Sequence, residues 1–123
     1  MKFFVYGTLK RGYGNHNYLK DSTFLGLARS METYTLYNCG FPLAYRDREG
    51  FHVEGEIYEV EDPKVVSDLD QLEGNGIFYL RTEREFWLKG QRVTAWIYEI
   101  PDKKFYHGAV CSINENNNYE WKR

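Results

Sequence analysis

The sequence predicts an α+β domain built on a curled antiparallel sheet or barrel, and three observations lead to this fold class. The chain has 123 residues, a length that suits a single domain. Several segments alternate apolar and polar side chains as β-strands do, whereas one segment has the spacing of an amphipathic helix. Aromatic residues make up 18% of the chain, and such rings fill β-rich cores or line cavities.

The N-terminal part of the chain predicts a strand followed by a loop. Residues 1–6 form a short, mostly apolar run, and we interpret residues 2–6 as a buried first strand that ends at Gly7 rather than as part of a signal peptide. The loop over residues 8–17 is long for so small a domain, and long loops are often functional. Asn15 is placed to cap a short helical turn that ends at Leu19.

The middle of the chain predicts three strands, over residues 24–29, 33–38 and 53–60. The second and third show the alternation of a half-buried strand. Residues 39–42, with sequence CGFP, break the second strand.

One helix is clearly marked, and it starts after the third of these strands. Asp62 is a favourable N-cap residue and Pro63 suits the first helical position. Gly74 is a typical residue at the end of a helix. Four residues recur at helical spacing and predict one apolar face: Val65, Val66, Leu69 and Leu72.

The C-terminal half of the sequence predicts a β-hairpin, and after it the alternation of apolar and polar residues ends. Residues 78–88 and 92–100 read as two long strands joined by residues 89–91. Beyond residue 100 the signal fades, and we expect residues 114–118 to be a loop or a frayed terminus. The chain is therefore predicted to be one domain over residues 1–123, with residues 101–123 as its variable C-terminal segment.

Composition narrows the function classes. The 16 Lys and Arg nearly balance the 18 Asp and Glu, which argues against a nucleic-acid partner. Cys39 and Cys111 make neither a disulfide framework nor a zinc site, and they indicate a reducing, cytoplasmic location. The three histidines show no metal-binding pattern, so no metal is expected. No apolar run reaches the length of a membrane span.

The end of the predicted helix carries an electrostatic anomaly. Its second half holds Asp68, Asp70 and Glu73, although the C-terminal turn of a helix favours cations. A carboxylate at the position of Glu73 is disfavoured as an anion, and burial would raise its pKa further. A raised pKa suits a group that takes up and returns a proton near neutral pH. The alternative is that all three carboxylates lie on a solvated helix face.

The loop after the first strand is a second candidate site. Gly7 permits backbone conformations that direct main-chain N–H groups toward a carboxylate or an oxyanion, although a plain glycine turn explains the same residues. The run Lys10-Arg11-Gly12 lacks the spacing of a phosphate-binding loop. Tyr79 and Arg81 share one strand face, and they either orient Glu73 or a substrate, or serve as a structural ring and a surface cation.

Taken together, these segments resemble the γ-glutamylcyclotransferase-like (AIG2-like) family, and residues 5–12 (VYGTLKRG) are closest to its γ-glutamylamine cyclotransferase branch. The Thr8 of this loop argues against glutathione as substrate, because the glutathione-degrading branches carry serine there. Further segments that resemble family motifs follow in order: residues 15–19 (NHNYL), 53–58 (VEGEIY), 69–74 (LDQLEG), 79–81 (YLR) and 93–98 (VTAWIY).

The resemblance implies a fold and a reaction. The fold is a small twisted, partly closed β-barrel with one main helix packed at its side. The reaction is the release of 5-oxoproline and a free amine from a γ-glutamyl amine such as γ-glutamyl-ε-lysine, by intramolecular aminolysis and with no cofactor. The implied partner is thus a small γ-glutamyl substrate, and we expect a monomer. The alternative is a non-catalytic binding module on the same fold.

The resemblance also implies roles for individual residues. Glu73 is the general acid and base. Main-chain N–H groups of Gly7, Thr8 and Leu9 hold the substrate and the oxyanion, and Tyr6 shapes the pocket. Further substrate-binding residues are Tyr79, Arg81 and Tyr98, and Tyr58 is expected beside the same pocket.

Overall fold

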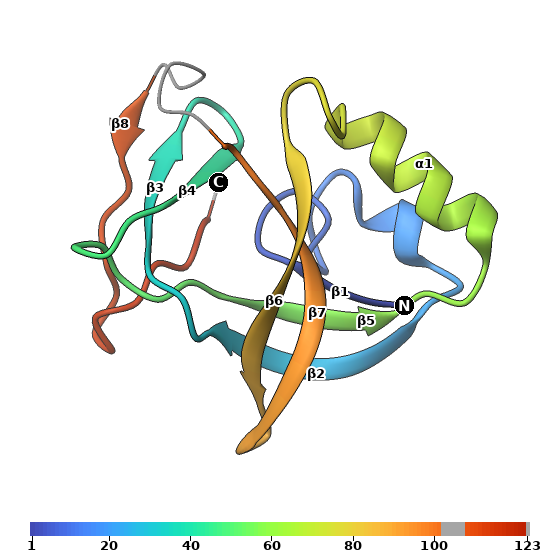
Figure 1. Cartoon of the computed structure of the whole chain (residues 1–123), viewed down its shortest axis with the longest axis horizontal. Helices are drawn as coiled ribbons and strands as arrows, with labels where there is room; N and C mark the ends of the chain where they lie inside the picture. Colours follow the sequence, from blue (N-terminus) through green and yellow to red (C-terminus); the bar gives the residue numbers. More distant parts are fainter. Residues whose placement is uncertain (102–107, 123) are drawn as a thin grey trace.

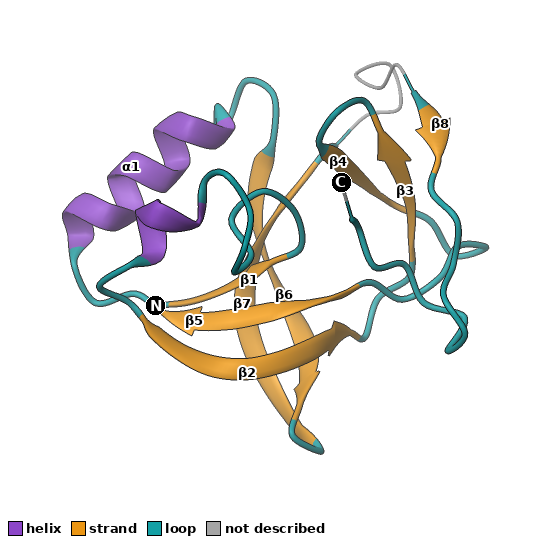
Figure 2. Cartoon of the chain, turned by 180° about the vertical axis from the view of Figure 1, so that it is seen from behind, coloured by secondary structure: helices purple, strands orange, loops and turns teal. Residues whose placement is uncertain are grey.

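The fold is a closed β-barrel with a small sheet on one flank and helix α1 on the other (Figures 1 and 2). The computed structural model describes residues 1–101 and 108–122. Within these residues the barrel strands follow the order β1-β5-β2-β6-β7. Their bounds are β1 (Lys2–Val5), β5 (Glu54–Glu59), β2 (Thr23–Ser30), β6 (Leu80–Leu88) and β7 (Gln91–Glu99).

The predicted fold class is confirmed, and the barrel is closed rather than partly open. Four of its strand pairs are antiparallel, and β7 closes the ring by pairing with β1 in parallel at Phe3 and Trp96. Strand direction cannot alternate all the way around a ring of five strands. One parallel pair is therefore unavoidable, and it lies where β1 meets β7.

The second sheet was largely missed by the sequence patterns. It has the order β4-β3-β8, with β3 (Tyr34–Asn38), β4 (Pro42–Arg46) and β8 (Ala109–Val110). Residues 39–41 of the CGFP segment, interpreted as a break, are the turn of a β3–β4 hairpin, and the Cys39 N–H donates to the Phe41 carbonyl at 3.2 Å within it. Pro42 is tolerated because it is the first residue of its strand.

Residues 114–118 form a loop, which was one of the two expectations, and the segment is packed onto the barrel rather than frayed. Tyr119 and Trp121 are buried. The loop before them is held by the Asn114 side chain, which accepts hydrogen bonds from the N–H groups of Asn116 and Asn118. The remaining part of the predicted variable segment, residues 102–107, lies outside the described residues.

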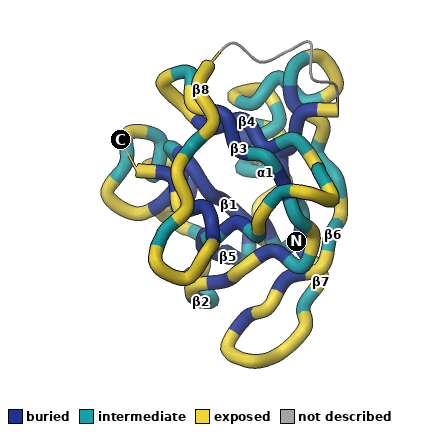
Figure 3. The backbone as a smooth tube through the Cα atoms, turned by 90° about the vertical axis from the view of Figure 1, so that its left-hand side faces the viewer, coloured by how far each residue is buried: buried dark blue, intermediate teal, exposed yellow. Residues whose placement is uncertain are grey.

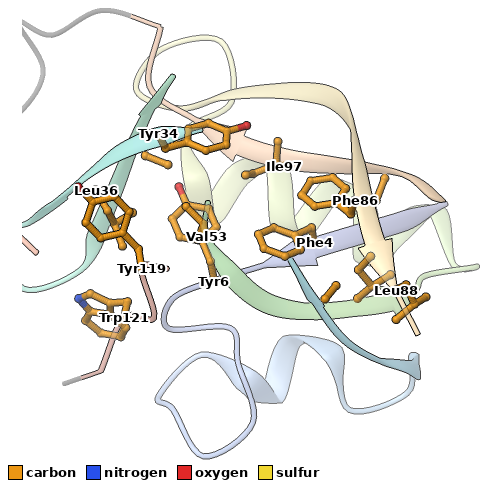
Figure 4. Close-up of a cluster of buried hydrophobic side chains, with 14 residues drawn as sticks. Phe4, Tyr6, Tyr34, Leu36, Val53, Phe86, Leu88, Ile97, Tyr119 and Trp121 are labelled. Atoms are coloured by element: carbon orange, nitrogen blue, oxygen red, sulfur yellow. The ribbon is translucent and has the colours of Figure 1, made fainter. Parts of the chain in front are cut away.

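Strand β1 is buried on both faces, and this explains its unbroken apolar sequence. Phe4 and Tyr6 point into a cluster that fills the barrel and extends under the second sheet to Tyr119 and Trp121 (Figure 4). Phe3 and Val5 point into a second cluster beneath α1. The chain that leaves β1 therefore emerges between the two clusters, within the molecule. Figure 3 shows the buried residues gathered around β1, β3, β4 and β5.

Helix α1 (Pro63–Glu73) begins and ends as predicted. The Asp62 side chain accepts from the Lys64 N–H at 2.9 Å, and Gly74 is left-handed with φ of 60°. Its apolar face is narrower than predicted, because Leu69 is buried whereas Leu72 is 36% exposed. A shorter 3-10 helix, η1 (His16–Leu19), precedes β2. No helix within the described residues is both long and apolar enough to cross a membrane.

The predicted hairpin is also present, and its turn is one residue shorter than expected. Lys89 and Gly90 have φ of 52° and 77°, and Leu88 pairs with Gln91. Two central residues with positive φ form the turn type that matches strand twist. Gln91 is thus the first residue of β7 rather than part of the turn.

We predict that Phe86→Ala destabilises the barrel by about 3–5 kcal/mol, because it removes a fully buried ring. Phe86 has 0% exposure and stacks on Phe4 with a centroid distance of 4.3 Å. Urea unfolding measures the change. The matched control is Trp87→Ala, the next residue on the same strand, whose side chain is on the outer face and should lose about 1 kcal/mol or less. Equal losses in the two variants would contradict this account of the core.

Candidate active site

A cavity of about 580 Å³ lies where the end of β1, the last turn of α1 and the β3–β4 turn meet. This volume is in the range typical of small-molecule sites. Six of the seven residues predicted to bind substrate line it, together with Glu73. The lining residues are Phe4, Val5, Tyr6, Gly7, Thr8, Leu9, Asn15, Gly40, Phe41, Pro42, Gln71, Leu72, Glu73, Gly74, Phe78, Tyr79 and Tyr98.

The loop after β1 is held in one conformation by its own hydrogen bonds. The Asn15 side chain donates to Thr8 Oγ1 at 2.9 Å, and its backbone N–H donates to the Thr8 carbonyl at 2.9 Å. Asn15 does occupy the N-cap position of η1, but its side chain makes no cap hydrogen bond and secures Thr8 instead. The Asn15 side chain thus fixes the loop that forms one wall of the cavity.

Gly7 is required at its position by a close approach. A Cβ atom there would lie 2.5 Å from Pro42 Cγ, so a side chain would push the loop away from the β3–β4 turn. Within the described residues, no protein group accepts a hydrogen bond from the N–H of Gly7, Thr8 or Leu9. The loop therefore lines the cavity with three successive backbone donors that have no protein acceptor, an arrangement suited to an anionic group.

Glu73 is the last residue of α1, and its carboxyl group has neither a hydrogen-bond nor an ion-pair partner among the described residues. Burial raises its pKa from 4.5 to about 7. The other two acids in the second half of the helix do have ion-pair partners. Asp68 pairs with Lys64 at 3.1 Å on the surface, as the solvated-face interpretation expects. Asp70 is bound by Arg81. Of the three acids in the second half of α1, Glu73 is therefore the one whose carboxyl group has no partner among the described residues.

Three tyrosines surround this carboxyl group, and each donates its hydroxyl proton elsewhere. Tyr6 donates to the Tyr98 carbonyl at 2.5 Å and Tyr79 to the Pro42 carbonyl at 2.5 Å. Tyr98 donates to Asp70 Oδ1 at 2.6 Å. Burial raises the pKa of all three hydroxyls, and the nearby carboxyl of Glu73 raises each further, so they stay protonated at neutral pH. None of the three donates to Glu73.

Two residues expected at the cavity lie elsewhere. Arg81 is not on the cavity wall, because its guanidinium is bound by Asp70, with Nε at 2.8 Å from Oδ1, and lies 4.6 Å from the Trp96 ring centroid. Tyr58 is buried in the second cluster, beneath α1, where its hydroxyl donates to Glu56 at 3.0 Å. The pattern placed Arg81 on the correct strand but did not show that an acid from the helix would bind it.

The β3–β4 turn forms a further wall of the cavity, which the sequence patterns did not predict. Gly40, Phe41 and Pro42 contribute to the cavity, and the Phe41 ring lies edge-on to Phe78 with centroids 6.2 Å apart. The available signal was a Gly-Phe-Pro run between alternating segments, which is typical of a tight turn that carries an aromatic residue. That signal indicates a turn, but it does not indicate which surface the turn contacts.

Within residues 1–101 and 108–122, no group of three or more His, Cys, Asp or Glu side chains is arranged to hold a metal ion. Cys39 and Cys111 are free thiols in the described part of the chain.

Comparison with known sequences identifies relatives of the whole chain. The family described as "Gamma-glutamyl cyclotransferase, AIG2-like" matches residues 3–122. A protein of Methanocaldococcus jannaschii, provisionally named a gamma-glutamylcyclotransferase, is 38% identical over 101 residues, which cover 80% of this chain and 83% of that protein. The gamma-glutamylaminecyclotransferase of Homo sapiens is 40% identical over 88 residues, covering 64% of this chain and 57% of the human protein.

Solved structures give the same relationship. An AIG2-like protein from Mus musculus superposes with a TM-score of 0.75 at 29% identity, covering 99% of this chain and 95% of the mouse chain. A protein of uncharacterized function from Pyrococcus horikoshii superposes with a TM-score of 0.72 at 26% identity, covering 96% and 88%. The barrel, the helix that ends at Glu73 and the loop after β1 are thus those of a known fold, and the chain belongs to the AIG2-like gamma-glutamyl cyclotransferase family.

Proposed function

We propose that the protein is a gamma-glutamylamine cyclotransferase that releases 5-oxoproline and a free amine, with Glu73 as general acid and base. One observation carries the proposal. Among the described residues, a carboxyl group without a partner, its pKa raised to about 7, lines the same cavity as Gly7, Thr8 and Leu9, whose backbone N–H groups have no acceptor there. The likeness of residues 5–12 to the γ-glutamylamine branch supports an amine, rather than glutathione, as the substrate type.

The residues that line the cavity supply both donors and acceptors, as a γ-glutamyl group requires. Its loop wall offers the three N–H donors, which suit the α-carboxylate of the substrate and the oxyanion that forms during the reaction. Its lining also offers the carboxyl of Glu73 and the hydroxyl oxygen of Tyr98, which suit the α-ammonium group. A substrate bound by both ends is folded so that its α-nitrogen approaches its own γ-carbonyl carbon.

The proposed reaction moves protons through Glu73. The ionised carboxylate takes a proton from the α-ammonium group, and the free amine attacks the γ-amide carbon. A C–N bond forms and the carbonyl electron pair moves to the oxygen, which the backbone N–H groups stabilise. The carbonyl then reforms, the bond to the leaving nitrogen breaks, and Glu73 returns a proton to that nitrogen. In all, two protons leave the attacking nitrogen and two reach the leaving nitrogen, one at a time.

We predict that Glu73→Gln lowers kcat/KM for γ-glutamyl-ε-lysine by about 10²–10⁴-fold, because glutamine cannot accept or return a proton. Released 5-oxoproline and lysine are quantified by mass spectrometry. For the wild type, kcat/KM should fall about tenfold for each pH unit below about 7, as the carboxylate is protonated.

The matched control for this experiment is Asp68→Asn, which removes a carboxylate from the same helix outside the cavity and should leave turnover unchanged. Equal turnover by the wild type and Glu73→Gln would refute the mechanism. A wild type that is thermally stabilised by γ-glutamyl amines of several kinds but converts none would identify a binding module instead.

A second prediction concerns stability and needs no substrate. A carboxyl whose pKa is raised on folding stabilises the native state below its unfolded pKa, and this contribution is lost as the pH rises through its folded pKa. The wild type should therefore lose about 3 kcal/mol relative to Glu73→Gln between pH 4 and pH 8, with most of the change between 4.5 and 7. Urea unfolding of both proteins across this range measures the difference. A difference that does not change with pH would show that Glu73 is ordinarily solvated.

A further inference from the structure

Tyr98, Asp70 and Arg81 form a chain of contacts that leads from the cavity wall to the outside of the barrel. Arg81 and Tyr98 are directly opposite each other on the paired strands β6 and β7. Asp70 reaches them from α1, where it accepts from Arg81 Nε at 2.8 Å, from Arg81 Nη2 at 3.2 Å and from the Tyr98 hydroxyl at 2.6 Å. Of the three residues, Tyr98 alone lines the cavity.

Arg81 is itself fixed from several sides. Its guanidinium lies 4.6 Å from the Trp96 ring centroid and 5.9 Å from that of Phe3. Its backbone N–H donates to Asn75 Oδ1 at 2.7 Å. A two-point ion pair with a guanidinium held in this way fixes both oxygens of the Asp70 carboxylate. The Tyr98 hydroxyl therefore meets an acceptor that is already in place.

Asp70 and Glu73 are three residues apart in α1 and so lie on the same side of the helix. The Tyr98 hydroxyl donates to Asp70, and Tyr98 lines the same cavity as Glu73. A hydroxyl has one proton to donate. The carboxyl that receives that proton gains a hydrogen bond, and the other does not.

We propose that Asp70, held by Arg81, is a positioning residue for the reaction. It binds the proton of the Tyr98 hydroxyl, so that Tyr98 turns an oxygen lone pair to the cavity and leaves the Glu73 carboxyl without a donor. Tyr98 is then available as an acceptor for an N–H group of the substrate. This inference rests on the proposed role of Glu73 as the acid and base.

The other groups that face Glu73 are consistent with this role for Asp70. From the end of β1, Tyr6 donates to the Tyr98 carbonyl, and from the segment before β6, Tyr79 donates to the Pro42 carbonyl. Tyr6 and Tyr79 have backbone acceptors, which no side-chain substitution removes. The acceptor of Tyr98 is a side chain, and it can therefore be tested.

The test is a double-mutant cycle on the full chain, read by the titration of Glu73. Glutamate labelled with ¹³C at the carboxyl carbon reports each Glu pKa by NMR, and the signal lost in Glu73→Gln assigns Glu73. Asp70→Ala removes a nearby anion and also frees the Tyr98 hydroxyl to donate to Glu73. In the Tyr98→Phe background only the effect of charge remains. We expect Asp70→Ala to lower the pKa of Glu73 in both backgrounds. The decrease should be about one pH unit larger when Tyr98 is present than in the Tyr98→Phe background.

Tyr98→Phe alone gives a second, independent outcome. It keeps the ring and the Asp70–Arg81 pair, so the fold should survive. It should leave the pKa of Glu73 within about half a unit of the wild-type value, because Tyr98 does not donate to Glu73. It should also lower kcat/KM about tenfold, through the lost acceptor. A rise of one unit or more in the pKa of Glu73, or equal effects of Asp70→Ala in both backgrounds, would overturn the proposal.

Failure of this inference is distinguishable from failure of the proposed function. The titration needs no turnover, so it tests the role of Asp70 even in a chain that releases no 5-oxoproline. If the enzyme is active and Asp70→Ala changes the pKa of Glu73 equally with and without Tyr98, then Glu73 remains the proposed acid and base. Only the positioning role of Asp70 is then refuted.

Discussion

The site depends on the partial burial of one carboxyl group that has no partner among the described residues. Burial of a charged group is costly unless hydrogen bonds or an opposite charge offset it, and Glu73 has neither among the described residues. The surrounding fold must therefore hold the group in place. Leu69 anchors α1 in the cluster beneath it, Asp70 ties the helix to β6, and Gly74 turns the chain away directly after Glu73. These contacts hold the end of the helix in place, and they thereby offset the free-energy cost of burying the Glu73 carboxyl group.

The barrel provides the other half of the site by bringing the loop after β1 to the same place. Strand β1 is buried on both faces, so the loop that follows it leaves the interior rather than the surface. The β3–β4 turn closes over it at Gly7, where Pro42 leaves no room for a side chain. The parallel closure between β1 and β7 also places Tyr98, near the end of β7, in the wall of the same cavity. The three parts of the site thus come from segments far apart in the sequence that meet because the barrel closes.

Helix caps and turn residues were sufficient to predict the elements whose ends they determine. The Asp62-Pro63 start and the Gly74 end predicted α1, and the residues around Lys89 predicted the hairpin, because caps and turns depend on neighbouring residues. The second sheet could not be found in this way, since β8 pairs with β3 across about seventy residues of chain. The anomalous acid at the helix end pointed to Glu73, and the family resemblance separated it from Asp68 and Asp70. Arg81 was misplaced because its partner comes from another element, which no spacing on its own strand reveals.

The charge distribution of the cavity suits the proposed binding of an anionic group by backbone N–H groups of the loop. Among the described residues that line it, Glu73 is the only charged one. A cation within about 4–6 Å would bind a substrate carboxylate well, but it would also lower the pKa of Glu73 by about 1–3 units. The carboxyl would then be ionised at neutral pH and too weak a base for its proposed role. Neutral N–H groups stabilise an anion without this effect. The nearby cation, Arg81, is kept off the cavity wall and neutralised by Asp70. The same requirement therefore accounts both for the backbone donors in the cavity lining and for the Arg81–Asp70 ion pair outside it.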